Sequence, residues 1–213
     1  MAKLFIFGIG GTGARVIKSL TMLLAAGVKT NYEIVPILID PDGNGGDLNR
    51  TTKALREYQT IQKELVDSTN CNFFKNRISS LSEVITRKGK NSNVISGFQY
   101  ELDGVENDNF RDFIDLGTLD TTNKWLTSLL FSDDNLNSNL EVGFKGDPNI
   151  GSVVLNQFTK SDAFEAFASS FEREDRVFII SSIFGGTGAA GFPLILKNIR
   201  EGRIKGEANE YLR

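Results

Sequence analysis

Glycine is concentrated in two short segments of this chain, Gly8–Gly13 and Gly185–Gly191. Each segment follows an apolar run that predicts a buried strand, and each leads into residues that predict a helix. At such a junction, backbone N–H groups and the helix dipole bind the phosphates of a ligand. A single segment of this kind also suits a tight turn that needs no ligand. Two of them in one chain predict a nucleotide that is held from two sides.

The first segment opens a strand–helix–strand unit, which favours phosphate binding over a turn that only packs the helix on the strand. We expect its amides to contact phosphate and the Thr12 hydroxyl to add a hydrogen bond. Arg15 lies in the first helical turn, where it either faces a phosphate or is an ordinary exposed side chain. The candidate phosphate contacts are Gly10, Gly11, Thr12 and Gly13.

The second segment has almost no bulk, since four of its seven residues are glycine and two are alanine. A stretch without large side chains lets a ligand approach the backbone closely. Thr187 is its one polar side chain. The candidate phosphate contacts are Gly185, Gly186, Thr187, Gly188 and Ala189.

Acidic residues follow the second predicted strand. Asp40 ends this strand, at the place where dinucleotide-binding proteins hold a ribose hydroxyl. In a nucleoside triphosphate site the same position can hold Mg²⁺ through water, and in a plain turn it caps the backbone before Pro41. Asp40 or Asp42 is the candidate magnesium ligand, although Asp42 and Asp47 are also explained as turn residues.

A third loop, Gly143–Gly151, is rich in turn-forming residues. Lys145 and the neighbouring amides, including that of Gly146, are candidates for a further phosphate contact. The alternative is an ordinary surface loop.

The composition excludes several classes of protein. The 213-residue chain has no histidine and one cysteine, which excludes Ser-His-Asp and Cys-His triads, His-ligated zinc and an internal disulfide. Carboxylates, hydroxyls, backbone dipoles and bound Mg²⁺ remain, and these are the means of phosphoryl transfer. A net charge of −3 and a pI of about 5.2 give no electrostatic footprint for nucleic acid. No apolar run is long enough for a membrane span.

The apolar patterning predicts one α/β domain over residues 1–213, with a mostly parallel sheet and helices on both faces. Pro36 argues against a central place for the second strand. Residues 67–140 are interpreted as an insertion with its own helices and at most one sheet strand. Strands are predicted at 3–7, 34–40 and 176–182, and helices at 12–26, 50–66, 152–171 and 192–199, the last opened by Pro193.

The sequence Gly185-Gly186-Thr187-Gly188-Ala189 resembles the glycine-rich phosphate signature of the tubulin and FtsZ superfamily of GTP-binding proteins. Three further segments follow the order of that family. Gly8–Gly13 resembles its first phosphate loop, residues 40–47 stand where the second loop would be, and Gly143–Gly151 resembles the bacterial form of the third. The likeness is to divergent bacterial tubulin-like proteins rather than to FtsZ itself. Phe184 and Ala190 depart from the signature, and the insertion has no counterpart in FtsZ.

The resemblance implies a Rossmann-like GTPase domain that binds GTP or GDP with Mg²⁺ in a cytoplasmic, bacterial cytoskeletal protein. It also implies that the full-length protein self-associates and hydrolyses GTP. In this family the domain continues with base-contacting loops, and a second domain supplies an acidic loop that completes hydrolysis on the neighbouring subunit. We therefore expect the chain to be the phosphate-binding part of a longer protein, incomplete at the C-terminus and without hydrolysis of its own. The preference for guanine rests on resemblance alone.

Three alternatives remain open. Residues 4–50 also resemble the ThiF and ubiquitin-activating class of ATP-dependent adenylating enzymes, which carry a D-x-D and then an N-L-N-R pattern after a similar glycine loop. An NAD-binding Rossmann protein explains residues 4–40. Neither of these explains the second glycine segment. A tubulin-like module that has lost turnover and acts as a scaffold explains the four loops as well as an active GTPase does.

Overall fold

A computed structural model describes residues 1–65, 71–89, 97–105, 109–141, 143–144, 146–201, 203–204, 207–208 and 211–212. Within these residues the chain forms a four-stranded, all-parallel sheet with the strand order β3-β2-β1-β4. The strands are β1 (Lys3–Ile9), β2 (Glu33–Ile39), β3 (Gln99–Tyr100) and β4 (Arg176–Ile180). The predicted α/β class with a parallel, Rossmann-like sheet is confirmed.

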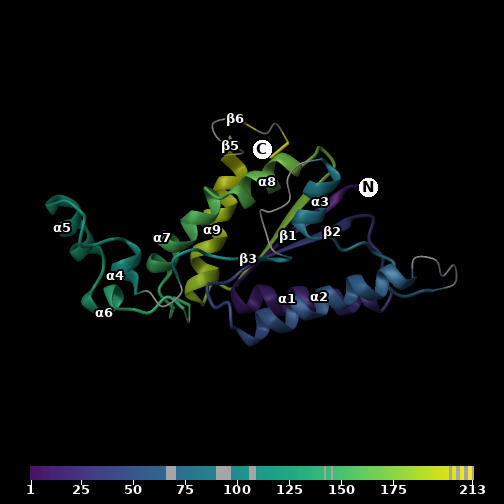
Figure 1. The fold of residues 1–213 in the computed structure, drawn as a ribbon, viewed down its shortest axis with the longest axis horizontal. Helices are drawn as coiled ribbons and strands as arrows, with labels where there is room; N and C mark the ends of the chain where they lie inside the picture. Colours follow the sequence, from purple (N-terminus) through teal and green to yellow (C-terminus); the bar gives the residue numbers. More distant parts are fainter. Residues whose placement is uncertain are drawn as a thin grey trace.

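Helices cover both faces of the sheet, as the patterning predicts (Figure 1). One face carries α1 (Gly10–Ala25) and α2 (Gly46–Leu65), and the other carries α3 (Leu81–Arg87), α7 (Pro148–Thr159), α8 (Asp162–Ser170) and α9 (Gly186–Glu201). Alternate residues of β1 point to opposite faces, so Phe5, Phe7 and Ile9 join one core while Ile6 joins the other. The sheet is thus the middle of three layers.

The first glycine segment is an abrupt strand-to-helix junction, whereas the second lies mostly inside α9, which follows β4 after a connection of residues 181–185. The strand β1 ends at Ile9 and α1 begins at Gly10, while α9 begins at Gly186. The predicted helix 192–199 is therefore too short, and Pro193 lies inside α9 instead of opening it. The prediction is wrong because a run of glycine and alanine is typical of a loop. Here these small residues form the first turns of α9.

Pro36 lies inside a strand with neighbours on both sides, contrary to the prediction. The backbone N–H groups of Ile34 and Leu38 both point outward from β1, to Arg77 O and Phe98 O. The nitrogen of Pro36 points to the same side, and β3 pairs there only with Leu38 and Ile39. Proline is tolerated because no described strand needs an N–H from this position.

The predicted helix 152–171 is two helices in the structure. Asp147 caps α7, which starts four residues early with Pro148 in its first turn. Ser161 then caps a separate helix, α8, by accepting a hydrogen bond from the N–H of Phe164 at 3.2 Å. The continuous apolar pattern concealed this break, since both helices face the same core.

The insertion contains α3 and β3, as well as three further helices beside the sheet. Among these, α5 (Thr121–Leu130) extends away from the body of the molecule (Figure 1). The described helices of the chain include none that is long and apolar enough to cross a membrane. The remaining elements are α4 (Phe110–Phe113), α5 (Thr121–Leu130), α6 (Asp133–Leu136) and an antiparallel pair, β5 (Arg203–Ile204) and β6 (Glu207–Ala208).

Candidate functional site

Both glycine segments line a single cavity of about 330 Å³ at the carboxyl ends of the strands. The turn after β2 and the third loop complete its wall, so four segments that are distant in the sequence meet at one place. Candidate residues among the lining are Gly10, Gly11, Thr12, Asp40, Asp42, Gly146, Gly185, Gly186, Thr187 and Gly188. Gly13 and Ala189 do not line the cavity, and Lys145 lies outside the described residues.

The cavity lies where the strand order reverses. After β1 the chain crosses to β2 on one side, while β4 pairs with β1 on the other side. The helices that follow β1 and β4 cover opposite faces of the sheet, which leaves a crevice between their first turns. In open α/β sheets this switch point is where ligands bind.

Three helix N-termini open onto the cavity without a side-chain cap. The residue before α1 is Ile9, which makes no capping bond. The carbonyls of Gly45 and Gly185 accept the first helical hydrogen bonds of α2 and α9, from Asn49 and Ala189. Glycine has no side chain with which to cap, so the first N–H groups of these helices are available to an anion.

The glycines of the cavity differ in what surrounds them. A Cβ atom on Gly13 would lie 2.5 Å from the carbonyl carbon of Gly8, and one on Gly188 would lie 2.8 Å from the backbone nitrogen of Ser182. These two glycines are required by packing. Gly185 has no atom within 4 Å of a built Cβ, and Gly11 has only an Asp47 oxygen at 3.5 Å. The latter two therefore face space that a ligand can enter.

Gly10 joins the two glycine segments. Its φ angle of +68° lies in the left-handed region that favours glycine. A built Cβ would lie 3.5 Å from the Cβ of Thr187, so the first turns of α1 and α9 are in contact across the cavity. The hydroxyls of Thr12 and Thr187 belong to the same lining.

Asp40 stands at the carboxyl end of β2 with a raised pKa. Burial penalises its charged form and raises the pKa to about 6, and the charges of Asp42 and Asp47 act in the same direction. The Asp42 N–H donates to Asp40 Oδ1 at 3.2 Å, which partly opposes the shift. The charged groups that act on the Asp40 carboxyl are therefore negative, and no described cation offsets them there.

Asp47 has a larger structural role than a turn residue. Its carboxylate pairs with Arg50 at 2.8 Å and with Arg15 at 3.0 Å, and the hydrogen bond from Arg50 lowers its pKa. Arg15 also donates to Thr12 Oγ1 at 3.2 Å, so it links α1 to α2 beside the cavity. Arg15 therefore bonds to other residues of the protein and does not line the cavity itself, although its guanidinium contacts the lining residue Thr12.

The third loop contributes a buried ring that sequence reasoning missed. Phe144 lines the cavity and is 2% exposed. Built Cβ atoms on Gly151 and Gly186 would lie 2.8 Å and 2.9 Å from its side chain, so the ring is enclosed by the first turns of α7 and α9. Phosphate binding gives no reason to expect such a residue, and the only signal in the sequence is a large apolar side chain in a loop of turn-forming residues.

The donor set of the cavity suits a magnesium ion that is shared with phosphate. Among the described residues, no group of three His, Cys, Asp or Glu side chains is placed to hold a metal by itself. Magnesium needs only one or two carboxylates when phosphate oxygens and water complete its shell. Asp40 and Asp42 fit that role, since the neighbouring negative charges oppose ionisation of Asp40 and a cation would favour it.

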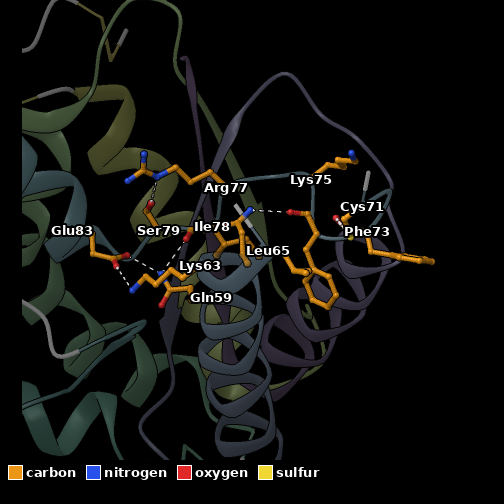
Figure 2. Close-up of a pocket in the computed structure, with 12 residues that line it drawn as sticks. Gln59, Lys63, Leu65, Cys71, Phe73, Lys75, Arg77, Ile78, Ser79 and Glu83 are labelled. Atoms are coloured by element: carbon orange, nitrogen blue, oxygen red, sulfur yellow. Dashed lines mark hydrogen bonds and ion pairs between the residues drawn. The ribbon is translucent and has the colours of Figure 1, made fainter. Parts of the chain in front are cut away.

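A second, larger cavity of about 520 Å³ lies at the other end of the sheet (Figure 2). It is formed by the last turns of α2 and the segment that follows Cys71, beside Ile78, which bridges to Ile34 of β2. Gln59 donates to Glu83 at 2.7 Å across its wall. No glycine lines this cavity, and the helix end beside it is the C-terminus of α2, whose partial negative charge does not favour a phosphate.

Comparison of the chain with models of known protein families and with curated proteins finds no match. The site is therefore interpreted from its own geometry.

Proposed function

We propose that this chain binds the phosphates of a nucleotide in the glycine-lined cavity, as the nucleotide-binding portion of a tubulin-like GTP-binding protein. One observation carries the proposal: the two glycine segments, the Asp40 turn and the third loop line the same cavity. Their order along the chain is the order of the phosphate loops in the tubulin and FtsZ superfamily. A dinucleotide-binding or adenylating protein gives no reason for the second glycine segment to face the first.

In the proposed complex, the backbone amides of the first turns of α1 and α9 hold the phosphate oxygens. Gly11 and Gly185 leave room for the phosphates to approach the backbone, and the hydroxyls of Thr12 and Thr187 add hydrogen bonds. Asp40, with Asp42, holds a magnesium ion that neutralises phosphate charge. Ion binding favours the ionised form of Asp40 and so lowers its pKa.

The proposed role of this chain is binding and positioning. No histidine is present anywhere in the sequence to act as a base, and in the resembled family the group that positions water comes from a neighbouring subunit. We therefore expect negligible hydrolysis by this chain alone. Hydrolysis and nucleotide-dependent assembly are proposed for a full-length cytoplasmic protein. The choice of guanine rests on the family resemblance.

Calorimetric titration with GTP, ATP and NAD, each with Mg²⁺, tests the proposal. Binding of GTP that weakens when Mg²⁺ is removed supports it. Tight binding of ATP together with pyrophosphate exchange would favour an adenylating enzyme and contradict it, and so would a preference for NAD. If GTP binds to a longer form of the protein without turnover or assembly, the binding site stands and the scaffold interpretation replaces the GTPase.

A further inference from the structure

The helices α4, α5 and α6 border a third cavity, which we call the α5 groove. Its volume is about 800 Å³, within the size range of sites that enclose a ligand. The side chains of Leu116 and Leu136 give it apolar walls. One face of α5 supplies a further wall, because residues three and four positions apart lie side by side on a helix. The lining residues from α5 are Thr121, Lys124, Trp125 and Ser128.

The apolar surface of the groove continues onto the outer side of α5, which extends away from the body of the molecule (Figure 1). Trp125 is 73% exposed and Leu129 is 83% exposed. Their spacing of four residues makes them neighbours on the helix surface, and Leu126 and Leu130 form the adjacent row. None of the residues of α5 is buried. An exposed apolar cluster with a polar rim is typical of an interaction site.

The unpaired charges around the α5 groove are negative. Residues 109–136 contain five aspartates against one arginine and one lysine, a net charge of −3. The Arg111 guanidinium lies 3.9 Å from an aspartate of α6, and Lys124 Nζ donates to a backbone carbonyl at 2.9 Å. Asp112 and Asp115 line the groove and have no ion-pair partner among the described residues. A complementary partner therefore presents apolar side chains that are flanked by positive charge.

The elements around the groove also restrict the backbone of the partner. None of the described lining residues belongs to a strand, so the groove offers no sheet edge to an extended peptide. A backbone that enters an apolar groove must then satisfy its own N–H and C=O groups. An amphipathic helix does so, and it places apolar side chains at i, i+3, i+4 and i+7 along one face.

We propose that the α5 groove binds an amphipathic helix of a partner protein, and that the polar face of this helix is basic. Trp125 and Leu129 contact its apolar face, while Asp112 and Asp115 pair with its lysine or arginine side chains. An anionic membrane or a second α5 groove is disfavoured, because each brings negative charge against negative charge. The groove shares no lining residue with the glycine cavity, so the partner helix and the nucleotide occupy separate sites.

The chain has one tryptophan, Trp125, so tryptophan fluorescence reports on the groove alone. The probe is a synthetic peptide of leucine and lysine, about 14 residues long, with leucine at i, i+3, i+4 and i+7. We expect the emission of Trp125 to move to shorter wavelength as the peptide removes the indole from water, and the affinity to fall as salt is added. The same peptide with glutamate in place of every lysine should leave the emission unchanged.

Two variants that keep the tryptophan locate the contact. Leu129→Ser removes an exposed apolar side chain and should weaken binding of the leucine–lysine peptide by about tenfold or more. Leu23→Ser on α1 is its matched control, since Leu23 is also exposed, and should bind like the wild type. Asp115→Asn should lower both the affinity and its dependence on salt, and asparagine suits the φ of 52° at this position. Glu174→Gln, at an exposed position outside the groove, is the matched control for charge. Circular dichroism checks that each variant folds.

Several results would overturn the proposal. Emission that does not respond to the leucine–lysine peptide is one, and an equal response to the glutamate peptide is another. Leu129→Ser that binds as tightly as the wild type would place the contact elsewhere. If the emission shifts with the concentration of the chain alone, and light scattering shows a matching rise in mass, a second copy covers the surface instead. Leu129→Ser should bind GTP like the wild type, because its position lies outside the glycine cavity.

Discussion

Helices that surround the glycine cavity begin differently from the helices elsewhere in the described chain. Six helices begin with a side chain that accepts a hydrogen bond from their own first turn. The three whose first turns line the cavity begin with isoleucine or glycine, which cannot provide such a bond. The six capping residues are Ser80, Asn109, Asp120, Ser132, Asp147 and Ser161.

A capping side chain contributes about 1 kcal/mol of stability relative to an apolar residue such as Ile9, and a few tenths of a kcal/mol relative to glycine. The other six described helices have caps, including α7, whose cap Asp147 follows the lining residue Gly146, so the absence of caps is confined to the three N-termini that line the cavity. The N–H groups there are free for water or for an anion, and a phosphate chain satisfies several of them together. The contrast supports the proposal that these N-termini bind the phosphates of a ligand.

The largest effect is expected where a cavity helix is held by packing. Gly13→Ala would place a Cβ 2.5 Å from the Gly8 carbonyl carbon and 2.9 Å from the Ile180 carbonyl oxygen. Because these are backbone atoms, we predict a loss of about 3 kcal/mol or more in the free energy of unfolding, measured in urea. Gly185→Ala is the matched control and should change it by less than about 0.5 kcal/mol, since no atom lies near its Cβ. Equal effects at the two positions would remove the distinction between packing and ligand-facing glycines.

Asp40 extends the comparison between the cavity and the rest of the protein, because its buried charge should reduce the stability of the free protein. Its folded pKa of about 6 exceeds the usual 3.8, so the folded state holds the proton more tightly than the unfolded state. Stability should therefore fall as pH rises from about 4 to 6 and stay low above it. We predict that Asp40→Asn raises the free energy of unfolding by about 2 kcal/mol at pH 8 and weakens Mg²⁺-dependent nucleotide binding.

The same Asp40→Asn variant at pH 4 is its own control. There the wild-type carboxyl group is mostly protonated in the folded state, so the difference in stability should largely disappear. Asp134→Asn, on an exposed position of α6, should have little effect at either pH. A variant that is less stable than the wild type at pH 8 would contradict the view that Asp40 is held in an unfavourable charged state.

A capping side chain at the start of α9 should raise the stability of the protein and lower its affinity for nucleotide. Gly185→Asp places a carboxylate at the start of α9, where Gly185 O already accepts from Ala189. We predict a gain of only a few tenths of a kcal/mol in stability, because glycine is itself a tolerated N-cap, and a loss of tenfold or more, about 1.4 kcal/mol, in nucleotide affinity. Gly185→Asn caps without charge and should lose less affinity. Unchanged affinity in the aspartate variant would show that no anion approaches this helix.

The smallest effect is expected on the periphery. Ser161→Ala removes the cap of α8, whose hydroxyl accepts from the N–H of Phe164 at 3.2 Å. Stability should fall by about 1 kcal/mol in thermal or urea unfolding, while nucleotide affinity stays the same. A change in affinity in this variant would mean that the two groups of helices are energetically coupled.

Continuous apolar runs made the central strands predictable from the sequence. Residues 3–7, 34–40 and 176–182 match β1, β2 and β4 closely because each contains a continuous apolar run that ends near a turn-forming residue, even though Phe178 of β4 is 58% exposed. The two-residue strand β3 has no such run. The break between α7 and α8 was missed because both helices present phenylalanines to one core. Local patterns specify an element, but its ends depend on caps such as Ser161.

The cavity could be predicted in outline only. Glycine segments, Asp40 and the third loop were found because their residue types are unusual at strand ends. The buried ring of Phe144 and the ion pair between Asp47 and Arg15 were missed, since both depend on contacts between segments that are distant in the sequence. Gly13 and Gly188 could not be separated from Gly11 and Gly185 either. Only the positions of surrounding atoms show which glycines pack and which face open space.

Amide chemical shifts measured during a nucleotide titration test the central claim most directly. In a ¹⁵N-labelled chain, GTP with Mg²⁺ should shift the N–H signals of Gly10, Gly11 and Gly186 strongly. The N–H groups of Glu83 and Phe164, which are bonded to the capping side chains of α3 and α8, should stay unchanged. If the cavity amides do not respond while amides elsewhere do, the uncapped helices are not the phosphate site and the proposed function is wrong.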